Sequence, residues 1–126
     1  MKKKKILVID DEIEILETTK KILDSARRYE VRTEISGTRA VDVAIEFMPD
    51  LILLDVAMPE MDGGQVASQI RANKYLENIP IIFVTGLIGE EEVVARKYAL
   101  GKQTYIAKPY DIKQLLECVE ENLAKE

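Results

Sequence analysis

Short apolar runs that end in charged or hydroxyl side chains restrict the fold of this chain more than any other feature of its sequence. Four such runs occur: Ile6–Ile9 followed by Asp10 and Asp11, Leu51–Leu54 followed by Asp55, Ile81–Val84 followed by Thr85, and Tyr105–Ala107 followed by Lys108. Runs of this kind are typical of β-strands buried on both faces. The carboxyl ends of parallel strands lie at one edge of a sheet, where α/β folds bind their ligands. The pattern therefore predicts a pocket in which carboxylates, a hydroxyl and an ammonium group meet.

Between these runs, apolar residues recur at helical spacing. They predict helices over Glu12–Arg28 and Ala40–Phe47, from Asp62 through Ile70, from Glu90 to Gly101, and from Asp111 through Leu123. One more strand is predicted over Val31–Ile35, which alternates apolar and polar residues as a strand near a sheet edge does. The strand that contains the last apolar run is predicted to span Gln103–Ala107. Five strands that alternate with five helices predict a parallel sheet covered on both faces.

Residues that begin or end helices support these boundaries. Pro49 is expected to stop the second helix, and Asp62 and Asp111 are expected to cap the helices that follow them. Gly101 is expected to end the fourth helix in a left-handed conformation. The last helix has an apolar stripe that consists of Ile112, Leu115, Leu116, Val119 and Leu123. Cys118 lies off this stripe, so we interpret it as a residue without a functional role.

Length and composition indicate one soluble domain over residues 1–126, because 47% of the residues are hydrophobic and 33% are charged. A formal charge of −5 argues against direct binding of nucleic acid. We interpret Lys2–Lys5 as a solvated segment before the first strand, because the apolar run after it is too short for a signal peptide or a membrane span. A lone cysteine and the absence of histidine fit a cytoplasmic protein that lacks a disulfide and the usual zinc ligands.

Asp10 and Asp11 are adjacent carboxylates at the end of the first run. Neighbouring carboxylates repel each other and raise each other's pKa unless a cation lies between them. Mg²⁺ prefers oxygen ligands and suits such a pair. The alternative interpretation is that both acids only begin the following helix and interact with its dipole.

Asp55 closes a fully apolar run, where a buried carboxylate is costly without a partner. A carboxylate can attack a phosphoryl group and form a mixed anhydride, so Asp55 is the candidate nucleophile. Lys108 could pair with Asp55 at rest and later with a phosphoryl oxygen, to which Thr85 could donate a hydrogen bond. A cis peptide bond at Pro109 could direct Lys108 inward. Each residue alone is also compatible with a turn or a surface position, and their joint occurrence at strand ends favours a site.

Four motifs occur together: Val8-Ile9-Asp10-Asp11-Glu12, Asp55 with Met58-Pro59-Glu60-Met61-Asp62-Gly63, Thr85-Gly86, and Tyr105-Ile106-Ala107-Lys108-Pro109-Tyr110. In this combination, and over essentially the whole chain, the sequence resembles the receiver domain of two-component response regulators. The resemblance implies a flavodoxin-like (CheY-like), doubly wound sheet of five parallel strands in the order 2-1-3-4-5 with five helices. It does not choose between a free-standing relay and the receiver of a longer regulator.

The resemblance also implies the roles of the site residues. Asp55 would take a phosphoryl group from a phosphohistidine on a sensor histidine kinase or histidine phosphotransfer protein. Mg²⁺ would be held by the carboxylates of Asp11 and Asp55 and by the backbone carbonyl of Ala57, and Asp10 would contact it directly or through water. Lys108 and Thr85 would neutralise and orient the transferred group. The chain would be a phosphoacceptor switch and not an enzyme with a separate substrate.

Signal output is expected to depend on Thr85 and Tyr105. When Thr85 moves towards the phosphoryl group, the Tyr105 ring could turn inward and change the surface of the fourth helix, fifth strand and fifth helix. That surface could form a homodimer on phosphorylation. From the residues alone, without the resemblance, the preferred interpretation of Tyr105 is a half-buried aromatic residue whose hydroxyl is in water.

Two positions are expected to set the lifetime of the phosphorylated state. In this family, the residues two positions past the phosphoacceptor and two past the hydroxyl influence hydrolysis, and here they are Ala57 and Leu87. Neither offers an acid or amide to position an attacking water. We therefore expect slow decay of the phosphoryl group.

Three other classes of protein are alternatives to a receiver domain. A Mg²⁺-dependent aspartyl-phosphate phosphatase typically has Asp-x-Asp-x-Thr after the first strand, and Asp10-Asp11-Glu12 does not fit that motif. A flavin carrier of the same architecture needs a phosphate-binding loop at this position, where the acidic Asp11–Glu14 segment would repel phosphate. A purely structural interaction module would show no dependence on Mg²⁺.

Overall fold

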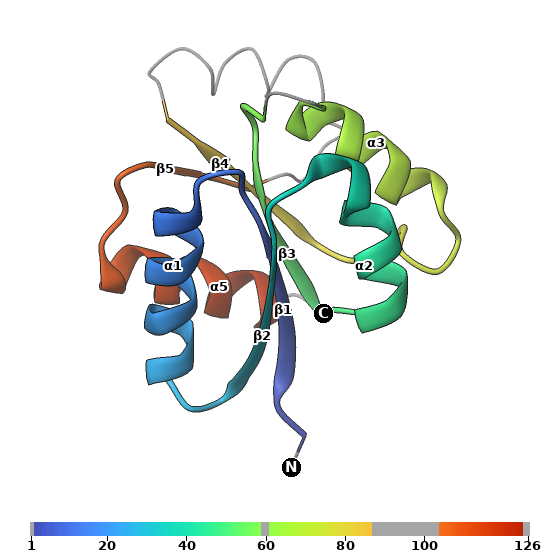
Figure 1. Ribbon diagram of the computed structural model, residues 1–126. Coiled ribbons are helices and arrows are strands. Elements are labelled where there is room, and N and C mark those ends of the chain that lie inside the picture. Colours follow the sequence, from blue (N-terminus) through green and yellow to red (C-terminus); the bar gives the residue numbers. More distant parts are fainter. Residues whose placement is uncertain (1, 59–60, 87–103, 125–126) are drawn as a thin grey trace.

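The computed structural model describes residues 2–58, 61–86 and 104–124 of the chain (Figure 1). The elements follow in the order β1 (Lys4–Ile9), α1 (Ile13–Ser25), β2 (Tyr29–Glu34), the 3₁₀ turn η1 (Gly37–Arg39), α2 (Ala40–Phe47), β3 (Leu51–Asp55), α3 (Gly63–Ala72), β4 (Ile81–Thr85), β5 (Thr104–Ala107) and α5 (Ile112–Ala124). None of the helices in this part of the chain is long and apolar enough to cross a membrane.

All five strands are parallel and lie in the order β2-β1-β3-β4-β5, which confirms the predicted fold class. The register pairs Ile9 with Leu54, Asp55 with Val84, and Thr85 with Ala107. The carboxyl ends of four neighbouring strands therefore meet at one edge of the sheet. This edge carries the polar residues that follow the apolar runs, as their positions in the sequence predicted.

Helices cover both faces of the sheet, and each face has its own apolar core (Figure 1). One core joins α2 and α3 to alternate strand residues such as Leu7, Leu54 and Phe83. The other joins α1 and α5 to the residues between them, such as Val8, Leu53 and Val84. Because successive side chains of a strand point to opposite faces, a continuous apolar run supplies both cores at once. This is why the central strands contain hardly any polar residue before their last position.

The helix boundaries largely follow the predicted signals. Asp62 caps α3 through a hydrogen bond from the Gln65 backbone N–H to Oδ1 at 2.9 Å, and the Gln65 side chain accepts a bond from the Asp62 N–H. Asp111 and Gln114 form the same reciprocal pair at the start of α5. Helix α2 ends before Pro49, with Met48 in a left-handed conformation. These caps satisfy backbone groups that a helix end leaves unpaired.

Some expectations need correction. Helix α1 ends at Ser25 and not at Arg28, because the chain turns through a left-handed residue, Arg27, before β2 begins. Strand β2 accordingly starts at Tyr29, two residues earlier than predicted, and ends at Glu34. Ile112 does not belong to the buried stripe of α5: it is 59% exposed, because it lies in the first turn. The helix predicted for residues 90–101 and position 103 of the last strand lie outside the described residues.

Gly63, the first residue of α3, lies directly against the end of β3. A Cβ atom at this position would be 2.5 Å from the Asp55 carbonyl oxygen and 2.9 Å from the Val56 Cα. Contacts this short with backbone atoms cannot be relieved by rotating a side chain. The Gly63 N–H donates a hydrogen bond to the Val56 carbonyl at 2.9 Å, so the close approach also fixes the loop after Asp55.

Replacing Gly63 by alanine is expected to lower the free energy of unfolding by about 2 kcal/mol, because the new methyl group forces α3 away from β3. Gly86→Ala is the matched control, since a Cβ there meets no atom within 4 Å, and it should change stability by less than about 0.5 kcal/mol. Urea unfolding followed by circular dichroism measures both. Equal stability of the two variants would contradict the steric argument.

Candidate functional site

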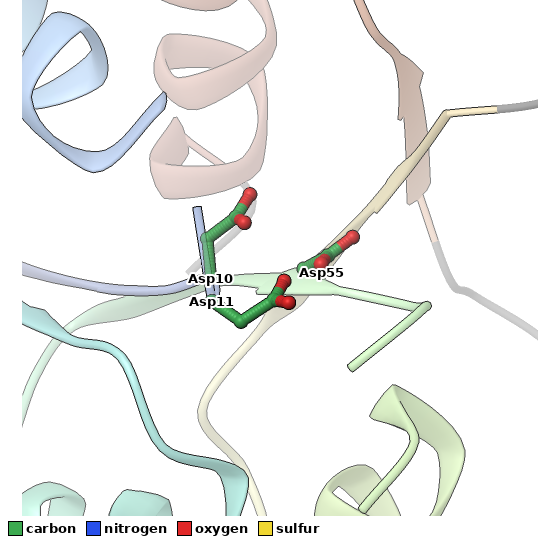
Figure 2. Close-up of side chains that lie close together, drawn as sticks. All are labelled: Asp10, Asp11 and Asp55. Atoms are coloured by element: carbon green, nitrogen blue, oxygen red, sulfur yellow. The ribbon is translucent and has the colours of Figure 1, made fainter. Parts of the chain in front are cut away.

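Three carboxylates meet at the carboxyl edge of the sheet. Asp10 follows β1, Asp11 follows Asp10, and Asp55 is the last residue of β3, the neighbour of β1. One oxygen from each side chain lies within 4.8 Å of the others. Figure 2 shows that Asp11 and Asp55 point towards the same space, with Asp10 directly beside them. Asp10 and Asp55 are only 2% and 3% exposed, whereas Asp11 is half-buried.

This cluster has the donor set of a hard divalent cation. Its ligands are all carboxylate oxygens, and the exposure of Asp11 and of the neighbouring Ala57 leaves one side open for water ligands. The Ala57 N–H lies 3.4 Å from Asp55 Oδ1, so the loop after β3 folds back on the carboxylate. The residues present therefore fit Mg²⁺.

The Lys108 ammonium group lies close to three carboxylates at this edge. Its Nζ atom lies 2.9 Å from Asp10 Oδ2, 3.0 Å from Glu12 Oε1 and 3.5 Å from Asp55 Oδ1. The Lys108 backbone N–H donates to the Thr85 carbonyl at 2.7 Å, which anchors the residue to the end of β4. The Lys108–Pro109 peptide bond is cis, as predicted.

Burial dominates the electrostatics of the site. It raises the pKa of Asp55 to about 7, and the Asp10 charge adds to this rise while the Lys108 ammonium opposes it. Burial also raises the pKa of Asp10, against hydrogen bonds from the Glu12 N–H and from Lys108. For Lys108, burial alone lowers the pKa, but the hydrogen bonds to Asp10 and Glu12 and the attraction of Asp55 together raise it. The ammonium is thus held charged, while the carboxylates remain short of positive partners.

Two hydroxyl groups near this edge have no hydrogen-bond partner within the described structure, although both oxygen atoms are buried: Thr85 Oγ1 and the Tyr105 hydroxyl. Phe83 pairs with Tyr105 across β4 and β5, and the two rings stack at 5.8 Å between centroids. Thr85 lies two residues after Phe83 and therefore on the same face of the sheet. The alternative interpretation of Tyr105, a half-buried ring with its hydroxyl group in water, is therefore wrong in one respect, because the hydroxyl oxygen is buried.

Three contacts were not foreseen. The Glu12 side chain reaches Lys108, and the Tyr110 hydroxyl shares a hydrogen bond with the fully buried hydroxyl of Thr19 on α1. Cys118, predicted to lie off the buried stripe, packs partly buried against the core between α1 and α5. The sequence did offer a signal for the Glu12 contact, because Glu12 is a third acidic residue directly after Asp10 and Asp11. Nothing in the spacing of Thr19 and Tyr110 indicated their contact, since 91 positions separate them.

Comparison with protein families identifies one that spans nearly all of the chain. The family described as "Response regulator receiver domain" matches residues 6–120. Among curated proteins, the chain is 37% identical over 122 residues to the nisin biosynthesis regulatory protein NisR of Lactococcus lactis, covering 97% of the chain and 51% of NisR. It is 31% identical to sporulation initiation phosphotransferase F of Bacillus subtilis, covering 98% of the chain and 96% of that protein. The chain thus spans about half the length of one relative and nearly all of the other.

Solved structures agree with this assignment. A putative response regulator from Chloroflexus aurantiacus superposes with a TM-score of 0.87 at 28% identity, covering 98% of the chain and 99% of that structure. The chemotaxis response regulator CheY4 of Vibrio cholerae gives a TM-score of 0.85 at 29% identity, covering 95% of the chain and 98% of that structure. The similarity therefore extends over the whole arrangement of strands and helices.

Replacing Asp55 by asparagine is expected to raise the free energy of unfolding of the metal-free protein by about 2 kcal/mol at about pH 8, because it removes a buried charge. The native carboxyl has a pKa of about 7 and the unfolded one about 4, so the native protein binds the extra proton between these values. Wild-type stability should therefore fall as the pH rises through this window, and the advantage of Asp55→Asn should vanish near pH ~4.

Urea unfolding in the presence of a chelator, repeated across this pH range, measures the effect. Glu30→Gln is the matched control, because it removes a carboxylate from an exposed position of β2. An Asp55→Asn variant that is less stable than the wild type above pH ~7 would contradict the assignment of a strained, buried charge.

Proposed function

Because the chain belongs to the family of response regulator receiver domains, we propose that it is a phosphorylation-dependent switch in which Asp55 accepts the phosphoryl group. The observation that carries this proposal is the position of Asp55: a nearly fully buried carboxylate that ends β3, between an acidic pair and a lysine ammonium. Residues 1–126 would act as one receiver domain. The donor would be a phosphohistidine on a sensor histidine kinase or a histidine phosphotransfer protein.

The transfer requires little covalent chemistry from the protein. An Asp55 carboxylate oxygen forms a bond to phosphorus while the bond from phosphorus to the donor nitrogen breaks, and the electron pair leaves with the imidazole. Lys108, 3.5 Å from Asp55, would neutralise a phosphoryl oxygen, and the Thr85 hydroxyl would donate a hydrogen bond to another. The backbone bond from Lys108 to Thr85 keeps these two residues side by side throughout.

Asp10, Asp11, Asp55 and the carbonyl of Ala57 would hold Mg²⁺. The bound cation would offset the charge of the carboxylates and of the incoming phosphoryl oxygens. The carboxylates leave negative charge for a cation to offset, because within the described site a single ammonium group faces Asp10, Asp55 and Glu12, and Asp11 adds a further carboxylate. The excess of negative charge supports a cation site more than a set of residues that only begins α1.

Thr85 and Tyr105 would transmit the change. Both hydroxyl oxygens are buried without a partner in the described residues, so each gains a hydrogen bond in any state that supplies an acceptor. A phosphoryl oxygen at Asp55 would supply one to Thr85. The Tyr105 ring, stacked on Phe83, would then adjust its packing at β5 and alter the neighbouring surface, which could serve for homodimer formation.

A hollow beside the site supports docking of the donor on α1 and on the loop before α5. It has a volume of about 220 Å³ and is lined by Glu14, Ile15, Thr18, Thr19, Lys108, Pro109 and Tyr110. Two exposed isoleucines, Ile13 and Ile112, begin the helices α1 and α5. A partner with a complementary apolar surface could reach Asp55 from here.

Incubation with acetyl phosphate and Mg²⁺ is expected to add the mass of one phosphoryl group to the intact protein. The gain should disappear with EDTA, because the carboxylate cluster then keeps its full charge, and it should disappear in Asp55→Asn. Intact mass spectrometry is the measurement. A Mg²⁺-dependent gain that survives in Asp55→Asn would contradict the choice of phosphoacceptor, and turnover of acetyl phosphate without a stable adduct would favour the phosphatase alternative.

The phosphorylated protein is expected to decay slowly, over minutes or longer, because neither Ala57 nor Leu87 can position a water molecule for attack. Ala57 is exposed next to Asp55, and Leu87 lies outside the described residues. The double variant Ala57→Asn, Leu87→Glu should shorten the lifetime. Loss of the phosphoryl mass after removal of acetyl phosphate measures it, and a wild-type lifetime of seconds would refute the prediction.

A further inference from the structure

Glu12, directly before α1, contacts Lys108 and does not cap the helix. It is the residue that precedes the first turn of α1, where side chains usually cap the helix, yet within the described residues it makes no capping hydrogen bond. Its Oε1 atom instead lies 3.0 Å from Lys108 Nζ, across 96 positions of the sequence. Glutamate is a poor capping residue, and its longer side chain is what allows it to reach Lys108.

The distances around Lys108 show which groups attract the ammonium most closely. It lies 2.9 Å from Asp10 and 3.0 Å from Glu12, but 3.5 Å from Asp55. The ammonium is therefore drawn away from the residue at which the phosphoryl group would arrive. Asp10 belongs to the carboxylate cluster that fits a cation, whereas Glu12 lies outside that cluster. Glu12 would remain as the competitor for Lys108 once a cation engages Asp10.

We propose that Glu12 is a positioning residue that holds the Lys108 ammonium away from Asp55 in the unphosphorylated protein and so slows phosphorylation. This inference rests on the proposed function of Asp55 and Lys108. The Glu12 side chain is 60% exposed and the Lys108 side chain 13%, so water and salt screen the pair. Screened pairs contribute modestly, and the expected effect of breaking this one is a two- to fivefold rise, roughly, in the rate of phosphorylation.

Three variants separate the contact from its charge. Glu12→Gln removes the charge, and Glu12→Asp keeps the charge but shortens the side chain so that it no longer reaches Lys108. Glu17→Gln is the matched control, because it removes a charge from an exposed position of the same helix that does not line the hollow beside the site. The second-order rate constant for phosphorylation by acetyl phosphate with saturating Mg²⁺ should rise about two- to fivefold in both Glu12 variants and remain near wild type in Glu17→Gln.

A second measurement needs neither metal nor phosphoryl donor. In ¹⁵N-lysine-labelled, metal-free protein, the ammonium protons of Lys108 should exchange with water faster in both Glu12 variants than in the wild type and Glu17→Gln. Since this readout is independent of phosphorylation, it stays informative if Asp55 proves not to be the phosphoacceptor. An unchanged exchange rate would overturn the contact itself.

The phosphorylation rates can also contradict the proposal. A rate that rises in Glu12→Gln but not in Glu12→Asp would assign the effect to charge alone, and an equal rise in Glu17→Gln would do the same. A lower rate in both Glu12 variants would mean that Glu12 assists Lys108. Each of these results would overturn the proposal, whereas loss of phosphorylation in all proteins including the wild type would instead refute the proposed function.

Discussion

The Lys108 ammonium group is the interaction on which the whole site depends, because it brings a positive charge into a buried cluster of carboxylates. Asp10 and Asp55 end neighbouring strands and are almost completely buried, so each would be strongly destabilised as an isolated anion. Lys108 contacts both, and its own burial is offset by these contacts. Burial, with the Asp10 charge added to it, raises the pKa of Asp55 to about 7, and one ammonium group does not cancel that rise. The residual negative charge is a property that a bound cation can exploit, and it links the stability of the fold to the chemistry of the site.

Backbone contacts beyond the strand ends keep this cluster in place. The Val56 N–H bonds to the Val84 carbonyl at 3.0 Å and the Lys108 N–H to the Thr85 carbonyl at 2.7 Å, so hydrogen bonding between the strands continues into the loops that carry the site. Gly63 lets α3 begin in direct contact with the Asp55 backbone. Site residues on loops are therefore held nearly as firmly as residues in the sheet, which is what orientation of a transferred group requires.

The sequence predicted the sheet and the location of the site because both follow from local patterns. Apolar runs that end in Asp10, Asp55, Thr85 and Lys108 were sufficient, since parallel strands bring their carboxyl ends to one edge. The contacts of Glu12 with Lys108 and of Thr19 with Tyr110 were not predictable, because they depend on the spacing between α1 and the loop before α5. The end of α1 was also misplaced, since Arg27 adopts a left-handed conformation that its residue type does not favour.

The two buried hydroxyls give the unphosphorylated state a specific disadvantage. A buried hydroxyl without a partner costs free energy, and Thr85 and Tyr105 both have this property within the described residues. They lie on one face of neighbouring strands, where Phe83, two residues before Thr85, stacks its ring on that of Tyr105. A group bound at Asp55 that accepts a hydrogen bond from Thr85 would relieve part of this cost only in the state that allows the contact. Modification of Asp55 would therefore favour the state in which Thr85 makes this hydrogen bond, and a partner that binds the surface of that state would bind more tightly. Because the coupling free energy between two sites is reciprocal, a bound partner would favour the modified state of Asp55 by the same free energy.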